Sequence, residues 1–271
     1  MNQRLPSWNR PLSALVLLGA AVGPVQAAGA PADLSGAVTL TVQSGPSYLG
    51  AQDRGLSLRP GFFLRWGRIS VSSAGGWAAR RQDVELRGLG FDLARTERFD
   101  ASLGLRMDSG RSESDSDALK GMGDVRRTLR ARIGADWRFA PGWQLSGSWT
   151  VDAFGRGGGN VGELRLRHEW PVSQMLTLSS GAALTVAGDS YMQSYFGVTP
   201  EQAQRTGYSV YSPGLGLRDL QLFTALRYEL DEHWVLTGGP GLTRVLGAAA
   251  RSPLTRKKQT WTLSAGAGYR F

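Results

Sequence analysis

Several residue types are scarce in this chain, and each scarcity excludes a class of protein. The 271 residues include no cysteine, which excludes disulfides, thiolate metal sites and cysteine nucleophiles. Histidine occurs only at His168 and His233, which excludes a metal centre built from several histidines. After the N-terminal segment, no apolar run reaches the roughly 18 residues that a transmembrane helix requires. Only 3 of the 31 basic residues are lysine, so the positive charge of the chain is carried almost entirely by arginine.

The N-terminal segment has the three parts of a secretory signal peptide. A basic region, an apolar core and a small-residue cleavage site follow one another at Arg4 and Arg10, at 12–22 and at 25–27. We expect cleavage between Ala27 and Ala28, so that residues 1–27 are removed and residues 28–271 form a single domain. The alternative, a buried N-terminal helix, is disfavoured because glycine and proline interrupt the segment. The chain is therefore expected to be exported.

Beyond this segment, apolar and polar residues alternate with a period of two. In 162–170, leucine and tryptophan alternate with glutamate and arginine, and in 260–271 every second residue is apolar. This period is typical of a strand with one apolar and one polar face. The pattern is weaker at 67–79 and 84–94, where a parity shift between Leu86 and Leu89 predicts a bulge. Segments that follow the pattern lie at 34–42, 56–66, 67–79, 84–94, 99–108, 129–139, 143–153, 162–170, 176–186, 220–229, 234–242 and 260–271.

The connections between these segments alternate between short and long. Short ones lie near residues 66–67, 95–96, 140–142, 171–172 and 231–232, and longer ones at 44–53, 109–124, 155–160, 188–209 and 247–257, with a modest link near 80–83. Short turns at one end and long loops at the other are typical of an outer-membrane barrel, whose short turns face the periplasm. The sequence predicts an all-β, transmembrane antiparallel barrel of about twelve strands, or ten if the two weak segments fail.

The positions of the aromatic residues support the same fold. Most lie on the apolar face, within a few residues of the short turns or the C-terminus, where they would form a periplasmic belt at the lipid headgroups. A soluble β-sandwich would have no reason to gather tryptophan at one end. Trp77, Trp149 and Trp261 lie nearer the long loops and are expected to begin an outer belt. The predicted periplasmic belt comprises Trp66, Trp137, Phe139, Trp143, Trp170, Tyr228, Trp234, Tyr269 and Phe271.

The polar face of such a barrel must line the lumen, because an arginine on the lipid side costs roughly 2 to 4 kcal/mol at the membrane midplane. We expect cross-strand ion pairs that fill much of the interior and serve mainly a structural role. A filled lumen disfavours a wide pore and leaves a narrow, anion-preferring passage open. The arginines recur every second residue along strands without an RNA-binding motif, which disfavours nucleic acid as a partner. The predicted lumen charges include Arg130, Arg132, Asp136, Glu163, Arg165, Arg167, Asp219 and Arg227.

No catalytic constellation stands out. Both histidines lie beside short turns, which disfavours a surface protease whose site would face outward. His168 lies on the lipid face, where a serine and histidine pair would suit an acyl hydrolase, but the sequence offers no suitably oriented partner. The glycine-rich run 155–159 lacks the lysine and spacing of a phosphate-binding loop. We expect a non-enzymatic protein without cofactor or metal.

Several motifs, in order along nearly the whole of 28–271, resemble the MltA-interacting protein (MipA/OmpV) family of outer-membrane proteins. Supporting motifs occur at 45–50, 110–111, 119–124, 199–200, 211, 214–219, 233–234, 252–253 and 269–271. One departure is visible at 248–251, which reads Ala-Ala-Ala-Arg where the family usually carries an acidic residue before Ser-Pro. Tyr269 and Phe271 form the C-terminal signature, which resembles the signal read by the barrel assembly machinery. The most specific motif is the loop that contains Tyr191, Met192, Gln193, Tyr195, Phe196, Gly197 and Val198.

The resemblance implies a location in the outer membrane of a Gram-negative bacterium, in contact with outer-membrane lipid. It also implies a scaffold for peptidoglycan synthesis and remodelling, with a murein lytic transglycosylase and a murein synthase as partners. The short periplasmic turns offer little surface for such partners, whereas the long loops face outward. Two alternatives therefore stay open: a narrow anion-preferring channel, and a surface adhesin or receptor that acts through the 188–209 loop. The aromatic residues of that loop are expected either to bind a ligand or, as we favour, to plug the barrel mouth.

Overall fold

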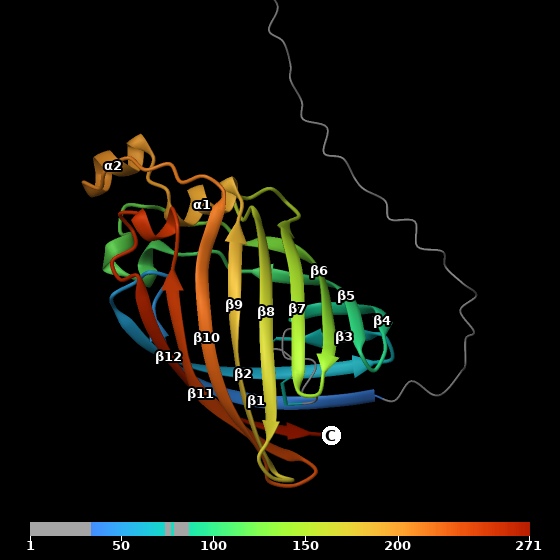
Figure 1. Cartoon of the computed structure of the whole chain (residues 1–271). Helices are drawn as coiled ribbons and strands as arrows, with labels where there is room; N and C mark the ends of the chain where they lie inside the picture. The colour runs from blue at the N-terminus through green and yellow to red at the C-terminus, as the bar shows by residue number, and fades with distance from the viewer. Residues whose placement is uncertain (1–33, 74–76, 79–86) are drawn as a thin grey trace, which may run out of the picture. The chain divides into compact units, whose positions relative to one another are not determined.

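The computed structural model describes residues 34–73, 77–78 and 87–271, all of which belong to one compact unit. Residues 1–27, the predicted signal peptide, lie outside the described part. Twelve strands form a closed antiparallel barrel in which each strand pairs with its neighbours in sequence and β1 pairs with β12 (Figure 1). The strands are β1 (Leu34–Pro46), β2 (Arg54–Trp66), β3 (Ile69–Ser72), β4 (Gly88–Arg95), β5 (Phe99–Asp108), β6 (Thr128–Ala140), β7 (Trp143–Asp152), β8 (Asn160–Pro171), β9 (Leu176–Ala187), β10 (Gly216–Glu229), β11 (Trp234–Val245) and β12 (Gln259–Arg270).

The predicted barrel of about twelve strands is confirmed, and the ten-strand alternative is not needed. The two weak segments do form strands, but β3 and β4 are the shortest in the barrel. Leu86 lies outside the described part, so the bulge predicted between Leu86 and Leu89 stays a prediction. The predicted link near 80–83 also lies outside the described part. An irregularity in register is present nearby in β4, between Asp92 and Ala94. A second one, between Leu217 and Asp219, lies at the beginning of β10, which starts four residues earlier than the sequence pattern predicts.

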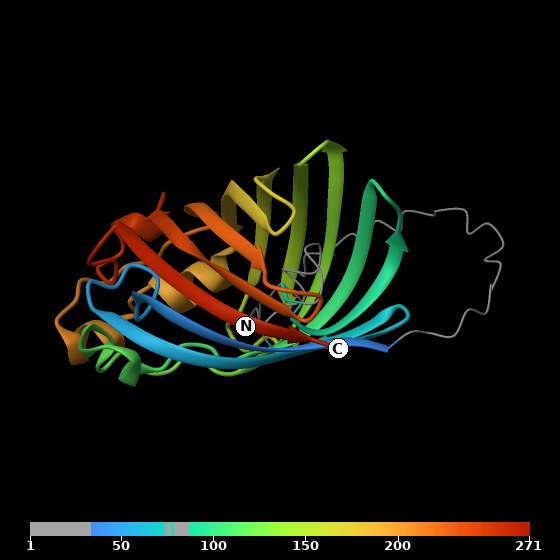
Figure 2. The ribbon, with the colours of Figure 1, turned by 90° about the horizontal axis from the view of Figure 1, so that it is seen from below.

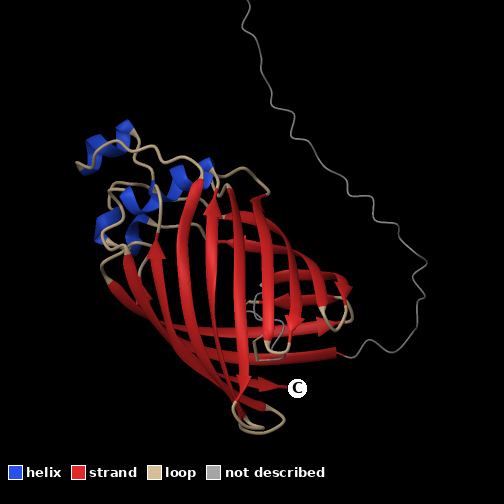
Figure 3. Ribbon diagram, viewed as in Figure 1, coloured by secondary structure: helices blue, strands red, loops and turns tan. Residues whose placement is uncertain are grey.

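Turns of two to four residues alternate with longer loops, as predicted, and every helix lies at the long-loop end (Figure 3). We call the two ends of the barrel the short-turn end and the long-loop end. No described helix is long and apolar enough to cross a membrane. The helices are η1 (Glu113–Asp115), η2 (Asp117–Leu119), α1 (Asp189–Phe196), α2 (Pro200–Thr206) and η3 (Ala249–Arg251).

The barrel closes where the two terminal strands meet (Figure 2). The backbone amide of Gly36 donates to the carbonyl of Phe271, and the amide of Phe271 donates to the carbonyl of Gly36. The Phe271 ring covers Gly36, where a β-carbon would lie 2.6 Å from the ring edge. Any larger residue at this position would therefore force the C-terminal aromatic ring to move.

Large apolar side chains cover the outside of the barrel. Ile133, near the middle of β6, is 54% exposed, and leucines on the neighbouring strands are exposed on the same face. The expected aromatic residues surround the short-turn end, and several are in ring contact in a chain that runs from Trp137 through Phe139, Trp143 and His168 to Trp170. This exposure is the reverse of a soluble fold and matches a wall that faces hydrocarbon.

The prediction for Trp77 is wrong. Trp149 and Trp261 are exposed on the outer wall as expected, but Trp77 packs inside the barrel beside Ala37 and Val235. Its carbonyl accepts a hydrogen bond from Arg227 of β10. The alternation of strand residues does not apply to Trp77, because β3 ends at residue 72 and Trp77 belongs to the connection that follows.

Replacing Ile133 with arginine tests the orientation of the wall. We expect Ile133→Arg to lower the free energy of unfolding by about 2 to 4 kcal/mol, because the guanidinium is forced into hydrocarbon. The measurement is denaturant unfolding in lipid vesicles. The control is Gln221→Arg, on the inner face of β10 beside Asp219, where the new charge can be paired and little change is expected. Equal destabilisation by the two variants would contradict this orientation.

Candidate functional site

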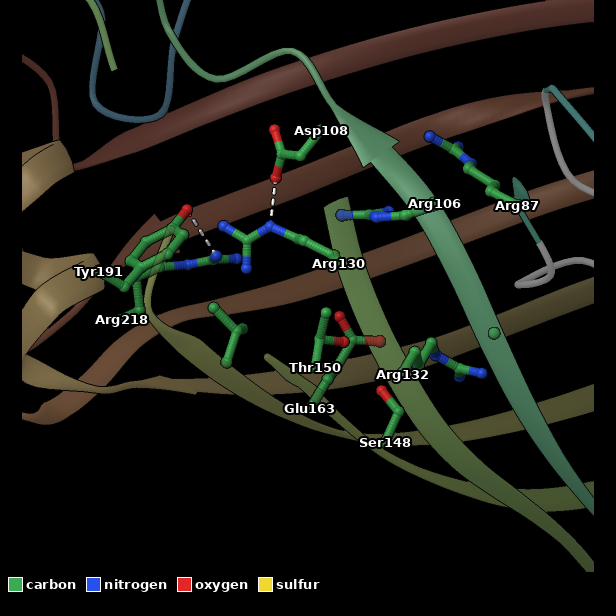
Figure 4. Close-up of a pocket in the computed structure, with 12 residues that line it drawn as sticks. Arg87, Arg106, Asp108, Arg130, Arg132, Ser148, Thr150, Glu163, Tyr191 and Arg218 are labelled. Carbon is green, nitrogen blue, oxygen red and sulfur yellow. Dashed lines mark hydrogen bonds and ion pairs between the residues drawn. The ribbon is translucent and has the colours of Figure 1, made fainter. Parts of the chain in front are cut away.

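Arginine dominates a cavity of about 180 Å³ inside the barrel, directly beneath α1 (Figure 4). β5, β6, β7, β8 and β10 supply most of its lining, and α1 supplies Tyr191 above it. Five arginines and two carboxylates line the cavity, which leaves an excess of three positive charges. The charged and hydroxyl-bearing lining residues are Arg87, Arg106, Arg130, Arg132, Arg218, Asp108, Glu163, Ser148, Thr150 and Tyr191.

Two of the five arginines are neutralised within the protein. Arg130, which is 2% exposed, forms an ion pair with Asp108 across the β5–β6 ladder and donates a 2.8 Å hydrogen bond to the carbonyl of Gly158. Arg218 forms an ion pair with the adjacent Asp219 and donates to the Tyr191 hydroxyl at 3.0 Å. These contacts fix both guanidiniums against the cavity wall.

The other three arginines, Arg87, Arg106 and Arg132, form no ion pair with any carboxylate in the described residues. Of the two cavity carboxylates, Asp108 is bound by Arg130 and Glu163 pairs with Arg165 at 2.9 Å. Arg106 and Arg132 are partly buried, and a buried charge is costly when it lacks a counter-ion, so these two guanidiniums and the exposed Arg87 favour an anion in the cavity. Figure 4 shows Arg87, Arg106 and Arg132 around the same space.

The remaining predicted lumen charges also lie on the inner face, but their pairing differs from expectation. Arg165 pairs with Glu163 at 2.9 Å on the same strand, and Arg227 pairs with Glu229 at 3.0 Å in the same way. Arg167 likewise contacts the carboxylate two residues along its own strand, that of Glu169. The expected cross-strand ion pairs occur for other charges, such as Arg138 with Asp100 at 2.8 Å. Where acids and arginines alternate on one face of a strand, the nearest partner is on that strand.

Two other predicted lumen residues, Asp136 and Asp219, have neutral hydrogen-bond partners, and Asp219 also contacts the adjacent Arg218. Asp136 of β6 accepts hydrogen bonds from Gln144 and Ser146 of β7. Asp219 is fully buried and contacts Arg218 and Gln221. Sequence reasoning missed Arg87, which lies in the weak segment 84–94. It also missed that Arg218 faces inward. The register irregularity between Leu217 and Asp219 places Arg218 on the same side as Asp219, which a strict alternation does not predict.

The family loop motif seals the long-loop end. Met192 and Phe196 of α1 are buried against Ala187, Val245 and Ala249, so the helix packs across the mouth of the barrel. Tyr191 and Tyr195 stack on each other with ring centroids 4.3 Å apart. We call α1 and the loops packed with it the cap. In the rest of the motif, Val198 is buried in a second cluster, and the carbonyl of Gln193 accepts a hydrogen bond from the Gly197 amide.

The second cluster of the cap joins three of the long loops. Leu119, Met122 and Leu254 pack around Val198. Tyr48 lies beside them and donates a 2.9 Å hydrogen bond to the carbonyl of Leu254. Burial raises the pKa of Tyr48 to about 12, with smaller contributions from Tyr208 and Asp53. Burial also raises the pKa of Tyr195 to about 12.

Neither histidine lies in the cavity. His168 contacts the rings of Trp143 and Trp170, and His233 stacks on Tyr269. The described residues contain no group of three or more side chains placed to hold a metal ion. Guanidinium groups attract anions, often through two hydrogen bonds to a carboxylate or phosphate. The cavity is therefore suited to a small anionic ligand.

A comparison with family models identifies the chain. The model of MltA-interacting protein MipA matches residues 38–271, which include most of β1 and all of β2 to β12. The chain belongs to the MltA-interacting protein MipA family. No curated protein matches it.

The solved structures with a similar arrangement include porins. The NanC porin has a TM-score of 0.45 and 8% identity, over 85% of this chain and 98% of that one. OprB of Pseudomonas putida has a TM-score of 0.45 and 8% identity, over 89% of this chain and 94% of that one. The anion-selective porin from Comamonas acidovorans has a TM-score of 0.40 and 11% identity, over 89% of this chain and 99% of that one.

Loss of Arg111 is expected to loosen the cap without unfolding the barrel. Arg111 is 6% exposed and donates a 2.9 Å hydrogen bond to the carbonyl of Tyr195, near the end of α1. Arg111→Gln should weaken the cap locally by about 1 to 3 kcal/mol, because a buried carbonyl loses its donor. Hydrogen exchange of residues 189–196 measures the effect. The control Arg98→Gln removes an exposed arginine at the short-turn end and should leave this exchange unchanged, and an unaltered rate in the Arg111 variant would contradict the proposed contact.

The two buried tyrosines give the cap a dependence on alkaline pH. Because folding raises their pKa values from 10.0 to about 12, their contribution to stability is complete below pH 10 and is lost as the pH rises toward 12. We expect the phenolate absorbance of the folded protein to show a late phase that Tyr48→Phe and Tyr195→Phe each reduce. A late phase that persists in the double variant would refute the assignment.

Proposed function

We propose that this chain is an outer-membrane barrel that binds a small anion in its lumen. The observation that carries the proposal is the cavity beneath α1, which three arginines line without a carboxylate ion-pair partner in the described residues. Family membership and the apolar wall support the membrane location. In this placement the short turns face the periplasm and the cap faces outward.

The cap favours binding inside the barrel over adhesion at its surface. Met192, Phe196 and Val198 of the 188–209 loop are buried, and Tyr191 lies over the lumen cavity and contacts Arg218. These residues therefore close the mouth and do not present an apolar surface to another cell. The hydroxyls of Ser148 and Thr150 add neutral donors to the cavity wall, which suits an anion with several oxygen atoms.

Removing two of the unpaired guanidiniums tests the anion site. Titration of the detergent-solubilised barrel with inorganic phosphate, followed by calorimetry, should give saturable binding that Arg106→Gln/Arg132→Gln weakens by about tenfold or more. The control, Arg138→Gln, removes an arginine that is already paired, with Asp100 near the short-turn end. Equal phosphate affinity in the native protein and the double variant would exclude this site, as would a preference for cations.

A murein transglycosylase is the second proposed partner, and the name of the family supports it. A hollow of about 480 Å³ lies at the short-turn end, between the β4–β5 and β6–β7 turns, and has Arg98, Arg138 and Glu169 among its lining residues. Arg138 holds the β4–β5 turn in place through hydrogen bonds to the carbonyls of Glu97 and Thr96 at 2.6 and 2.7 Å. The hollow is thus a rigid, charged surface on the side proposed to face the periplasm. A scaffold that also recruits a murein synthase would use the same rim.

Charge reversal at this rim tests the partner. In a pull-down with a purified murein lytic transglycosylase, Arg98→Glu should reduce capture about fivefold or more, because a rim charge affects both steering and contact. Arg205→Glu makes the same charge change on α2, at the opposite end of the barrel, and should have no effect. If the native barrel captures no more enzyme than an unrelated barrel, the partner assignment is wrong.

A further inference from the structure

The charged residues of the strands generally face the lumen. At the long-loop end, two arginines on the described strands face outward instead. Arg54 lies on the same face of β2 as the exposed Leu56 and Leu58. Arg244 lies on the same face of β11 as the exposed Trp234 and Leu236. Both are exposed and both lie at the long-loop ends of their strands, at the upper edge of the apolar wall.

Both arginines belong to one sector of the wall. β2, β1, β12 and β11 are consecutive in the barrel, so Arg54 and Arg244 are three inter-strand spacings apart, about 14 Å. On β5, β7 and β10, of which β10 adjoins β11, the outward positions near the long-loop end are apolar, with Met107, Val151 and Leu217 exposed. Among the described strands, the arginines that face outward at this end therefore lie on β2 and β11, on either side of β1 and β12.

Backbone and side-chain contacts hold the members of this cluster in place. Arg54 donates a 2.8 Å hydrogen bond across β1 to the carbonyl of Trp261 on β12. Arg244 is the register partner of Gln259, two residues before Trp261. Between them lies the exposed Lys257, whose amide donates to the carbonyl of Gly50 in the β1–β2 loop at 3.0 Å. We call Arg54, Arg244 and Lys257, with the exposed Trp261, the wall patch.

No carboxylate neutralises the wall patch. None of its three cations takes part in an ion pair among the described residues. Asp53, next to Arg54 in sequence, accepts hydrogen bonds from Ser47 at 2.6 Å and Ser116 at 3.0 Å. That carboxylate is therefore occupied by the hydroxyls of the loops. The cations remain available to an external anion at the level where the apolar wall ends.

We propose that the wall patch binds the phosphate groups of a phosphorylated glycolipid in the outer leaflet. The acyl chains of such a lipid would lie on the apolar wall below, and its phosphates would lie at the level of Arg54, Arg244 and Lys257. Trp261, which is 53% exposed, would contact the boundary between chains and headgroup. The proposal rests on the proposed membrane placement, but it is independent of the lumen anion site.

Binding of lipid A to the full barrel in detergent micelles tests this proposal, with enzymatically dephosphorylated lipid A as the comparison probe. Each cation near an anionic headgroup contributes roughly fivefold to affinity, so Arg54→Gln/Arg244→Gln/Lys257→Gln should bind lipid A about a hundredfold more weakly. The native protein should prefer the phosphorylated probe. Equal affinity for the two probes, or native affinity in the triple variant, would overturn the proposal.

Two controls separate the wall patch from other charge effects. Arg205→Gln removes an exposed cation from α2 and should keep native affinity for lipid A, and an equal loss there would show a non-specific effect of net charge. Arg106→Gln/Arg132→Gln changes the lumen alone and should also keep native affinity for lipid A. Failure of the lumen site and failure of the wall patch are therefore distinguishable. If the triple variant does not fold, binding of lipid A to the native protein is measured at increasing salt concentration. Binding that does not depend on salt would exclude a phosphate contact and overturn the proposal.

Discussion

The closed hydrogen-bonded sheet is the constraint on which the rest of the structure depends. Hydrocarbon offers no partner for backbone groups, so every strand must be paired on both sides, and the Gly36–Phe271 contact completes the last ladder. Closure gives each strand residue one of two environments, lipid or lumen. In a strand with arginine or glutamate at every second position, only one register places the charged residues in the lumen and the apolar residues against lipid. The high arginine content is thus a consequence of the polar face being enclosed.

Enclosure then determines how the charges interact. Where acids and arginines alternate on a strand, as in β8, each arginine finds a carboxylate two residues away, and the lumen is locally neutral. β5 and β6 differ, because Asp108 is the carboxylate nearest to Arg106 and Arg130 and it pairs with Arg130. This local imbalance, more than the total charge, makes the region beneath α1 attractive to an anion.

Much of the fold follows from the sequence because period-two alternation is a local signal. The strand number, the alternation of turns and loops, and the aromatic belt all depend on residues a few positions apart. Trp77 was misplaced because it lies beyond the end of β3, where parity no longer carries information. The cavity was only partly predictable for a related reason: its lining comes from five strands and α1, and the arginines that lack a partner are identified only when the cross-strand pairs are known.

The outward arginines show that parity can place a residue correctly and still leave its role open. Arg54 falls on the apolar face of β2, which at the membrane midplane would be strongly unfavourable. At the end of the strand the same orientation places the guanidinium at the level of the headgroups, where charge is stabilised by phosphate. Depth along the strand therefore decides whether an outward arginine is a defect or a contact. Arg54 and Arg244 lie at this edge on β2 and β11, on either side of β1 and of β12 with its exposed Trp261, so a lipid whose chains cover these strands would bring its headgroup to both charges.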